Sequence, residues 1–335
     1  MLSTDLETPA APRNRRSEKA RLDVVLVYKK SQFQLAQENR NARIQSLVDD
    51  DDVSVRPLLL AHQAHEASLR AVELALKAAG CNVRRLYRAR LKPEHCEGRL
   101  LVAVGGDGTL LDASHKVTDG PAVGVNSDTA RSTGFLCAAD ASSFPALLDD
   151  ILTRKLVATP VRRLCGDVDG RPLPFPILND ILICHKNPAQ TSRYLVDHGG
   201  VIEDHKSSGV WVSTATGSTA AVASAGGFIQ DLGDARLQWH VREPFVADGP
   251  LWRHANFFFD HDGKDQVAVT SKMREGRVWL DGPHNCVVWP MGSRLTLHGR
   301  CPPLRLFATA EMAARRREAR KQAEARMTGF VEVPG

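Results

Sequence analysis

The sequence places an acidic residue inside a glycine-rich turn, Gly105-Gly106-Asp107-Gly108-Thr109. An apolar run, residues 100–104, precedes the turn, and a helix-like segment, residues 110–116, follows it. A glycine-rich turn between a strand and a helix presents backbone N–H groups and the positive end of the helix dipole, an arrangement that binds phosphate. The turn is not a Walker A loop, because no Gly-Lys-Ser/Thr follows, and Leu111 stands where a dinucleotide fingerprint needs its third glycine.

Asp107 is unusual in such a turn, because a carboxylate repels a phosphate. It could hold the metal ion that accompanies the phosphate, or it could accept a proton from a hydroxyl that attacks the phosphate. The structural alternative is an ordinary Asp-Gly turn. The motif as a whole indicates phosphoryl transfer or phosphate binding.

Three further segments carry polar groups where a ligand could bind. Asn126 closes the next predicted strand, at the edge where an open parallel sheet binds its ligands. Asn179 and Asp180 interrupt an apolar stretch, which is costly unless the pair makes a turn or reaches the hydroxyls of a ligand. Residues 213–221 combine hydroxyls with glycine and carry no charge, so this segment allows either close approach of a ligand or tight helix packing.

The secondary structure that must position these residues differs between the first and the second half of the chain. In the first half, apolar strand-like runs at residues 22–28, 99–104 and 122–125 alternate with helix-like segments such as residues 64–79. This alternation predicts a parallel sheet. From about Thr159 onward, short alternating segments separated by turns predict antiparallel strands, with residues 266–270, 277–280, 286–289 and 294–297 as a meander.

Composition and charge narrow the class of protein. With 335 residues and 43% hydrophobic residues the chain suits about two domains, and it is neither collagen-like nor wholly disordered. The net charge of +5 comes from residues 1–21 and 311–327, and the rest of the chain sums to zero, so we expect solvated tails and no nucleic-acid partner. The longest uncharged stretch, residues 207–230, is too polar to span a bilayer, so no membrane association is expected.

Cysteine usage and the first residues predict the compartment. The seven cysteines are scattered without Cys-x-x-Cys spacing, which argues against a disulfide framework or a zinc site and favours a reducing compartment. The first 20 residues contain three acidic residues and no apolar core of a secretory signal. We therefore expect a cytoplasmic protein.

Four segments together resemble the NAD kinase family. They are the Gly-Gly-Asp-Gly-Thr turn at 105–109, Asn179-Asp180, residues 212–220 and Leu280-Asp281-Gly282. The first segment is shared with diacylglycerol and sphingosine kinases and more remotely with phosphofructokinases, whereas the other three favour NAD kinase. The resemblance runs from about Leu22 to Phe307.

The resemblance implies an enzyme that transfers the terminal phosphate of ATP, with Mg²⁺ or another divalent cation, to the adenosine 2′-hydroxyl of NAD or NADH, making NADP(H). Asp107 would be the general base, and no residue is assigned as a metal ligand. The implied nucleotide-binding residues are Gly105, Gly106, Gly108, Thr109, Asn126, Phe135, Asn179, Asp180, Thr219, Ala220 and Ser224. Family members usually form dimers or larger assemblies, so we expect a homodimer or larger homo-oligomer.

The family fold is an α/β nucleotide-binding domain with a parallel sheet, followed by a β-sandwich-like domain, with the chain end returning to the first domain. Applied to this sequence, it implies a flexible basic tail at 1–21, an α/β domain at 22–155 and a β-rich dinucleotide-binding domain at 156–300. Residues 301–335 would be the return segment and a polar C-terminal helix or tail.

Several departures from the family pattern point to a divergent branch that includes plant NADH kinases and animal mitochondrial enzymes. Gly134 comes eight positions after Asn126, where five are usual, and Ser208 and Ala221 replace a carboxylate and a tyrosine. Asp128 is our candidate to replace the lost carboxylate. The choices between NAD and NADH, and between ATP and polyphosphate, stay open.

Two other functions are compatible with the turn. A lipid or other small-alcohol kinase of the same superfamily would need an apolar entrance, and the hydroxyl-rich residues 213–224 argue against it. A dinucleotide-binding regulator without catalysis would fit the changes at Ser208 and Ala221, but Asp107 argues against it.

Overall fold

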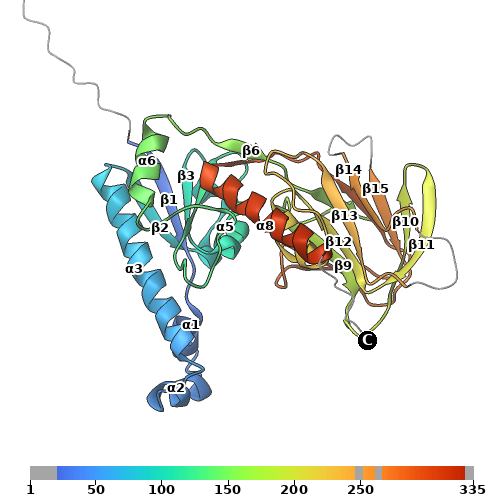
Figure 1. Ribbon diagram of the computed structural model, residues 1–335, viewed down its shortest axis with the longest axis horizontal. Helices are drawn as coiled ribbons and strands as arrows, with labels where there is room; N and C mark the ends of the chain where they lie inside the picture. Colours follow the sequence, from blue (N-terminus) through green and yellow to red (C-terminus); the bar gives the residue numbers. More distant parts are fainter. Residues whose placement is uncertain (1–20, 246–251, 261–265, 329–335) are drawn as a thin grey trace, which may run out of the picture.

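The computed structural model describes residues 21–245, 252–260 and 266–328. The predicted basic tail therefore lies almost wholly outside the described residues. Within them the chain forms one mostly parallel sheet covered by helices, and two antiparallel sheets that pack face to face (Figure 1). This arrangement confirms the predicted fold class.

The first sheet has the strand order β2-β1-β3-β4-β19-β6, with β5 also paired to β4. All its pairings are parallel except that of β6 with β19. Its strands are β1 (Asp23–Tyr28), β2 (Asn82–Tyr87), β3 (Leu100–Gly105), β4 (Pro121–Asn126), β5 (Cys137–Asp140), β6 (Thr159–Val161) and β19 (Leu304–Leu306).

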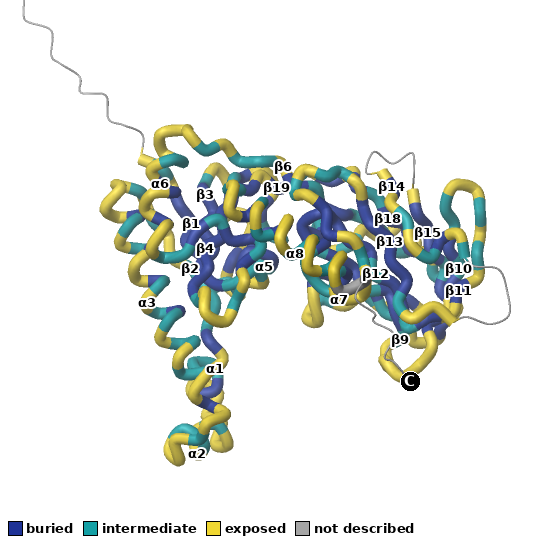
Figure 2. Tube along the Cα trace, viewed as in Figure 1, coloured by how far each residue is buried: buried dark blue, intermediate teal, exposed yellow. Residues whose placement is uncertain are grey.

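Helices cover both faces of this sheet, which explains why its central strands are continuous apolar runs. Residues 24–27 of β1 are completely buried, and the central strands are dark in Figure 2. One face packs on α3 and α6, and the other packs on α5 and α8. The helices are α1 (Gln32–Glu38), α2 (Ala42–Asp49), α3 (Arg56–Ala78), η1 (Arg88–Arg90), α4 (Pro93–Cys96), α5 (Asp107–Ser114), α6 (Phe144–Leu152), η2 (Gly217–Thr219), α7 (Ala221–Ser224) and α8 (Ala310–Thr328).

The two antiparallel sheets have the orders β11-β10-β15-β18-β7-β8 and β14-β13-β12-β9-β16-β17. Their inner faces share one core, which contains Tyr194, Trp239 and Trp289. The strands are β7 (Cys165–Val168), β8 (Arg171–Pro172), β9 (Asp180–His185), β10 (Ser192–His198), β11 (Val201–Ser207), β12 (Gly209–Ser213), β13 (Leu237–Arg242), β14 (Asn256–Phe259), β15 (Val267–Ser271), β16 (Gly276–Leu280), β17 (Cys286–Val288) and β18 (Arg294–His298).

The predicted meander is wrong in its pairing, although its four strands exist. β15 pairs with β18 in one sheet, while β16 and β17 pair with each other in the facing sheet. The chain crosses between the sheets twice in this stretch, because each sheet needs its own apolar face against the shared core. Local alternation of residues predicts a strand but not its partner.

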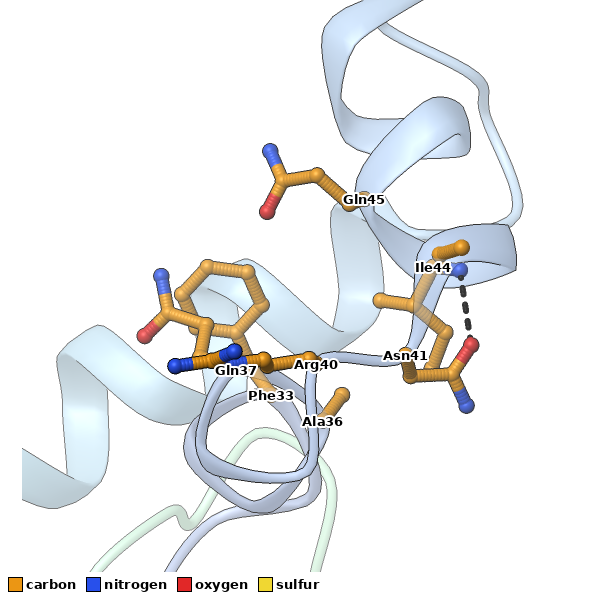
Figure 3. Close-up of a pocket in the computed structure, with 8 residues that line it drawn as sticks. Phe33, Ala36, Gln37, Arg40, Asn41, Ile44 and Gln45 are labelled. Atoms are coloured by element: carbon orange, nitrogen blue, oxygen red, sulfur yellow. Dashed lines mark hydrogen bonds between the residues drawn. The ribbon is translucent and has the colours of Figure 1, made fainter.

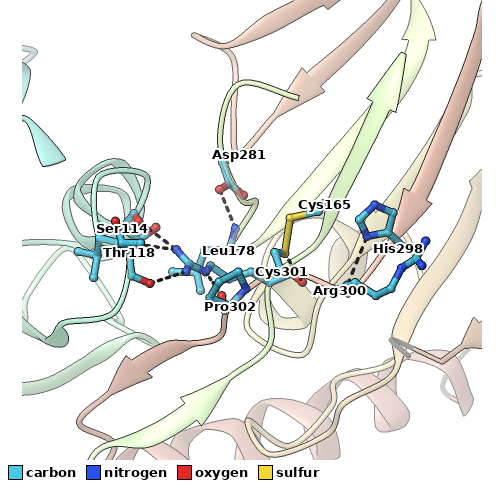
Figure 4. The surroundings of a disulfide bond; sticks show 11 residues. Ser114, Thr118, Cys165, Leu178, Asp281, His298, Arg300, Cys301 and Pro302 are labelled. Carbon is cyan, nitrogen blue, oxygen red and sulfur yellow. Dashed lines mark hydrogen bonds between the residues drawn. A yellow bond between two sulfur atoms is a disulfide. The ribbon is translucent and has the colours of Figure 1, made fainter. Parts of the chain in front are cut away.

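The chain passes between the two halves at residues 162–165 and again at 299–303, and these two crossings are tied together (Figure 4). A disulfide joins Cys165 to Cys301, whose Cα atoms are 6.0 Å apart. The buried Arg163 guanidinium donates to the carbonyl of Pro302 (2.7 Å) and to the carbonyl of Val117, just after α5 (2.9 Å). This pair could not be recognised in the sequence, since the two cysteines are 136 residues apart.

Among the described residues, none of the helices is both long enough and apolar enough to cross a membrane.

Candidate functional site

The phosphate turn follows β3 directly, and Asp107 is the first residue of α5. One carboxylate oxygen of Asp107 accepts the backbone N–H of Phe135 (2.9 Å), and the other accepts that of Leu136 (2.8 Å). The Cys137 thiol also points at this carboxylate (Sγ to Oδ1 3.7 Å). Each carboxylate oxygen has two lone pairs, so this loop fixes the orientation of Asp107 and leaves acceptor capacity for a ligand.

Gly105 allows a close backbone approach within the turn. A Cβ atom added to Gly105 would lie 2.1 Å from the Thr109 hydroxyl oxygen, so no side chain fits there. The Thr109 hydroxyl oxygen is itself buried and has no hydrogen-bond partner in the structure. An unsatisfied buried hydroxyl beside the N-terminus of α5 is suited to a phosphate oxygen.

Asn126, at the end of β4, shapes the loop that holds Asp107. Its side-chain amide donates to the Ser132 carbonyl (2.8 Å), and its side-chain oxygen accepts the Asp128 N–H (3.1 Å). Gly134 has φ +63° and lies against the Asn126 amide, which a Cβ would approach to 2.7 Å. The predicted binding residues Asn126 and Phe135 therefore both contribute to the loop around Asp107.

Two positively charged residues, Lys29 after β1 and Arg88 after β2, lie at the same edge of the sheet. Lys29 directly follows β1, and burial, followed by the nearby Arg88, lowers the pKa of Lys29. The buried His65 fixes this corner, because its ring nitrogens contact the Lys29 carbonyl (2.8 Å) and the Ser127 hydroxyl (3.0 Å). Lys29 is therefore placed where the sheet's carboxyl edge meets the phosphate turn.

Leu178 and Asn179 form a bend that leads into β9 at Asp180, and Asp281 holds this Asn179-Asp180 turn in place. The Asp281 carboxylate accepts the N–H groups of Leu178 (2.9 Å), Asn179 (2.8 Å) and Asp180 (3.1 Å). In the sequence, Asp281 stood out only as part of Leu280-Asp281-Gly282, which carried the family resemblance; its φ of 49° is typical of a turn residue. Its side-chain role was missed, because the backbone groups that it binds are 101 to 103 residues away.

His115 links this turn to the phosphate turn. It follows α5, and its Nε2 lies 2.8 Å from an Asp281 carboxylate oxygen, with both side chains almost completely buried. The ring stacks on Phe175 at a centroid distance of 3.8 Å. Asp281 therefore connects the helix that begins at Asp107 with the Asn179-Asp180 turn.

The hydroxyl-rich segment packs directly against the same turn. A Cβ on Gly217 would lie 2.2 Å from the Asn179 carbonyl oxygen, and the Thr214 hydroxyl donates to the Leu178 carbonyl (2.5 Å). The side-chain oxygen of Asn179 is buried without a partner in the structure. Thr219, Ala220 and Ser224 are partly or fully accessible. Some hydroxyls of this segment therefore pack against neighbouring backbone, while the adjoining residues stay accessible.

Asp180 is buried, and this burial, with the nearby Asp281 charge, raises the pKa of Asp180 to about 7. The native state therefore retains a proton on Asp180 that an unfolded carboxyl has lost above about pH 4.

We expect Asp180→Asn to become more stable than the wild type as the pH rises from about 4 to about 7. The free energy of unfolding of the wild type falls over this interval, because Asp180 is protonated in the native state and ionised in the unfolded state. The amide does not titrate, so its stability relative to the wild type increases by at most about 4 kcal/mol between pH 4 and pH 7. Chemical denaturation at a series of pH values measures it. A stability difference that does not change with pH would contradict the assignment.

Comparison with known proteins identifies the family. No family model matches the chain. It is 35% identical over 233 residues to a probable NADH kinase of rice (Oryza sativa subsp. japonica), a match that covers 62% of this chain and 70% of that protein. It is also 35% identical over 239 residues to an NADH kinase of Arabidopsis thaliana, covering 62% and 72% of the two chains. This chain belongs to the NAD kinase family.

Solved structures of the family have the same fold. An NAD kinase from Archaeoglobus fulgidus, determined in complex with ATP, superposes with a TM-score of 0.65 over 90% of this chain and 99% of that chain, at 19% identity. A yeast NADH kinase complexed with NADH gives a TM-score of 0.62 over 95% and 91% of the two chains, at 16% identity. The return of β19 to the first sheet is part of this NAD kinase fold.

Asp128, our candidate to replace the lost carboxylate, pairs with Arg131 in the structure. Both of its carboxylate oxygens lie 3.0 Å from Arg131, and it follows β4 in the first half of the molecule. Ser208 lies in the second half, between β11 and β12, where it borders a separate pocket of about 410 Å³.

We therefore expect Asp128→Ala to leave the affinity for NAD and NADH within about twofold, since its charge is already neutralised by Arg131. Fluorescence titration with NADH measures this. A loss of tenfold or more would restore Asp128 as the replacement for the carboxylate missing at Ser208.

A second hollow lies away from these residues, on the arm formed by α1 and α2 (Figure 3). It has a volume of about 310 Å³, and Phe33 and Ile44 contribute to its lining. None of the predicted site residues borders it.

Proposed function

We propose that this chain is an NAD(H) kinase, which transfers the terminal phosphate of ATP to the adenosine 2′-hydroxyl of NAD or NADH. The observation that supports this most directly is the placement of Asp107. Two backbone N–H groups hold its carboxylate at the N-terminus of α5, beside a turn in which Gly105 leaves no room for a Cβ atom. Membership of the NAD kinase family supplies the reaction that this geometry serves.

In the proposed step, Asp107 accepts the proton of the 2′-hydroxyl while that oxygen bonds to the terminal phosphorus of ATP. The bond from this phosphorus to the bridging oxygen breaks, and ADP leaves with the electron pair. Residues Gly105, Gly106, Gly108 and Thr109 would hold the transferred phosphate through N–H groups and the free Thr109 hydroxyl. Lys29 would add positive charge at the same edge of the sheet.

The dinucleotide would bind in the second half of the molecule. Asn179 and Asp180 would contact the adenosine, since the Asn179 side-chain oxygen is buried and unpaired in the structure. The accessible Thr219, Ala220 and Ser224 would line the same pocket. The His115–Asp281 contact would hold this pocket at a fixed position relative to Asp107.

A divalent cation such as Mg²⁺ fits this site without a protein cage. In the part of the chain that the structure describes, no group of three or more His, Cys, Asp or Glu residues could hold a metal ion. Mg²⁺ at phosphate sites takes one or two carboxylates, and the nucleotide phosphates and water supply the other ligands. The cation would neutralise charge on the phosphates, and we assign it no dedicated protein ligand. We also propose that the enzyme acts as a homodimer or larger homo-oligomer.

An end-point assay tests the proposal. The protein is incubated with ATP, Mg²⁺ and either NAD or NADH, and NADP(H) is detected with an NADP-specific coupled enzyme. Product that depends on ATP would establish the kinase, and the ratio of the two rates would give the preferred acceptor. Folded protein that makes no product from either acceptor would refute the proposal.

A further inference from the structure

The C-terminal helix α8 lies between the first sheet and the paired antiparallel sheets (Figure 1). The sequence predicted a polar helix or tail there, with its charges in solvent. The helix is present, but one of its faces is buried. Met312 and Arg316 are buried, whereas Arg317 is exposed. The buried face could not be recognised from the sequence, because arginines at neighbouring positions of a helix normally indicate a solvated surface.

Arg316 binds the segment that would line the dinucleotide pocket. Its side chain is 1% exposed and donates to the carbonyl of Ala215, the hydroxyl of Ser218 (2.9 Å) and the carbonyl of Gln230 (2.9 and 3.1 Å). The Thr219 hydroxyl lies 3.5 Å from the same guanidinium. All these acceptors are neutral, and a buried cation is costly unless its donors are satisfied. The five N–H donors of arginine suit it to tie several carbonyls together.

Arg315 extends to the other half of the site. It donates to the carbonyl of Cys137 and lies 3.5 Å from that of Thr133. These two residues flank Phe135 and Leu136, whose N–H groups hold the Asp107 carboxylate. Consecutive residues of α8 therefore contact the loop that orients Asp107 and the turn that leads into Thr219.

Further along the helix, Arg320 adds a second attachment on the dinucleotide side. Its Nε donates to the Ile229 carbonyl (2.7 Å), and its guanidinium pairs with Asp231 (3.0 Å). Burial lowers the pKa of Arg316 to about 10, and the acidic groups that oppose this are Asp231 and Asp107. Arg316 therefore stays charged at neutral pH and lies within electrostatic reach of the proposed base.

We propose that Arg315 and Arg316 are positioning residues, which together hold the Asp107 loop and the 215–219 turn at the spacing that phosphoryl transfer requires. This inference rests on the proposed kinase function. Neither arginine needs to touch the reacting atoms. Both act through the backbone that they bind, and small misplacements of reacting groups are enough to slow an enzyme substantially.

The experiment compares Arg315→Ala and Arg316→Ala with Arg317→Ala, which removes the same charge from the same helix at an exposed position. For Arg316→Ala we expect the dinucleotide KM to rise about 10- to 100-fold, the range for losing a charged buried hydrogen bond, with the ATP KM changed less. For Arg315→Ala we expect kcat to fall about tenfold and the dinucleotide KM to stay within about twofold. Arg317→Ala should match the wild type.

Arg316→Lys separates positioning from charge, because lysine retains the cation but cannot tie several carbonyls together. We expect it to recover only part of the lost affinity and to remain testable if the alanine variant does not fold. Folded Arg316 variants with wild-type kinetics, or with effects equal to those of Arg317→Ala, would overturn the proposal. So would equal changes in the ATP and dinucleotide KM values.

Two readouts do not depend on turnover, so failure of the kinase function can be distinguished from failure of this inference. NADH titration by fluorescence should show the loss of affinity in Arg316→Ala. Hydrogen exchange should show faster exchange at residues 215–219 in that variant, and at residues 133–137 in Arg315→Ala. If the wild type makes no NADP(H), the kinase proposal fails, while unchanged exchange at these segments would refute the positioning role.

Discussion

Asp107→Asn is expected to fold and to lose about 10²- to 10⁴-fold in kcat, which is the usual contribution of a general base. The amide has the same shape as the carboxylate, but it cannot accept the hydroxyl proton. The asparagine side chain has one oxygen and one NH₂ group, so its NH₂ group must face the backbone N–H of either Phe135 or Leu136. That N–H loses its acceptor, which costs about 1–3 kcal/mol of stability. The ATP-dependent production of NADP(H), measured at saturating substrates, checks the change in kcat.

A matched control lies on the same helix. Asp112 is also an aspartate of α5, and its carboxylate pairs at a half-exposed position with Arg88 (2.7 Å). Asp112→Asn should retain kcat within about threefold, since surface ion pairs contribute at most about 1 kcal/mol. An Asp107→Asn enzyme that turns over near the wild-type rate would remove Asp107 as the base, even if the family activity is present.

Asp281→Asn is expected to raise the dinucleotide KM about 10- to 100-fold and to destabilise the protein. The carboxylate accepts three backbone N–H groups and contacts His115, and an amide replaces one acceptor oxygen with a donor. Leaving a buried N–H without an acceptor costs about 1–3 kcal/mol. The Asn179-Asp180 turn would then no longer hold the adenosine-binding groups in place. Steady-state kinetics with NAD and NADH, and titration with NADH, measure the effect.

Asp169→Asn provides a comparison with the same backbone geometry. Asp169 also has a positive φ, 52°, and its side chain accepts the backbone N–H of Arg294 (2.7 Å), but it lies in the exposed turn after β7. Asparagine tolerates this conformation, so the variant should retain wild-type KM values. Equal KM changes in Asp281→Asn and Asp169→Asn would mean that Asp281 has no specific effect on the dinucleotide site.

The parts of the site that the sequence predicted are those encoded within one short segment. The turn at 105–109 follows from a strand, three glycines and a helix, so its place at the end of β3 was predictable. The turn at Asn179-Asp180 was one of two local alternatives. Their connection was not predictable, because it depends on Asp281 and His115, which are 166 residues apart and meet only in the folded chain.

The same limit explains the errors about β15–β18 and α8. Alternation along a strand shows which residues face a core, but both antiparallel sheets offer the same core, so partner choice is a tertiary property. Arginines such as Arg316 look like solvated charges until carbonyls from residues 100 positions away surround them. Cys165 and Cys301 gave no spacing signal for a similar reason.

The pairing of β6 with β19 has a consequence for the order in which the molecule can be completed during synthesis. Leu304 pairs with Val161, so the whole antiparallel half is inserted between two neighbouring strands of the first sheet. Ala122 of β4 also pairs with Leu306, so β4 has no partner on this side until β19 has been synthesised. A chain emerging from the ribosome can therefore assemble the inserted half before the edge of its own first sheet is closed. The first sheet is therefore completed only after the inserted half has been synthesised. Until then its unpaired edge is a site where misassembly can start.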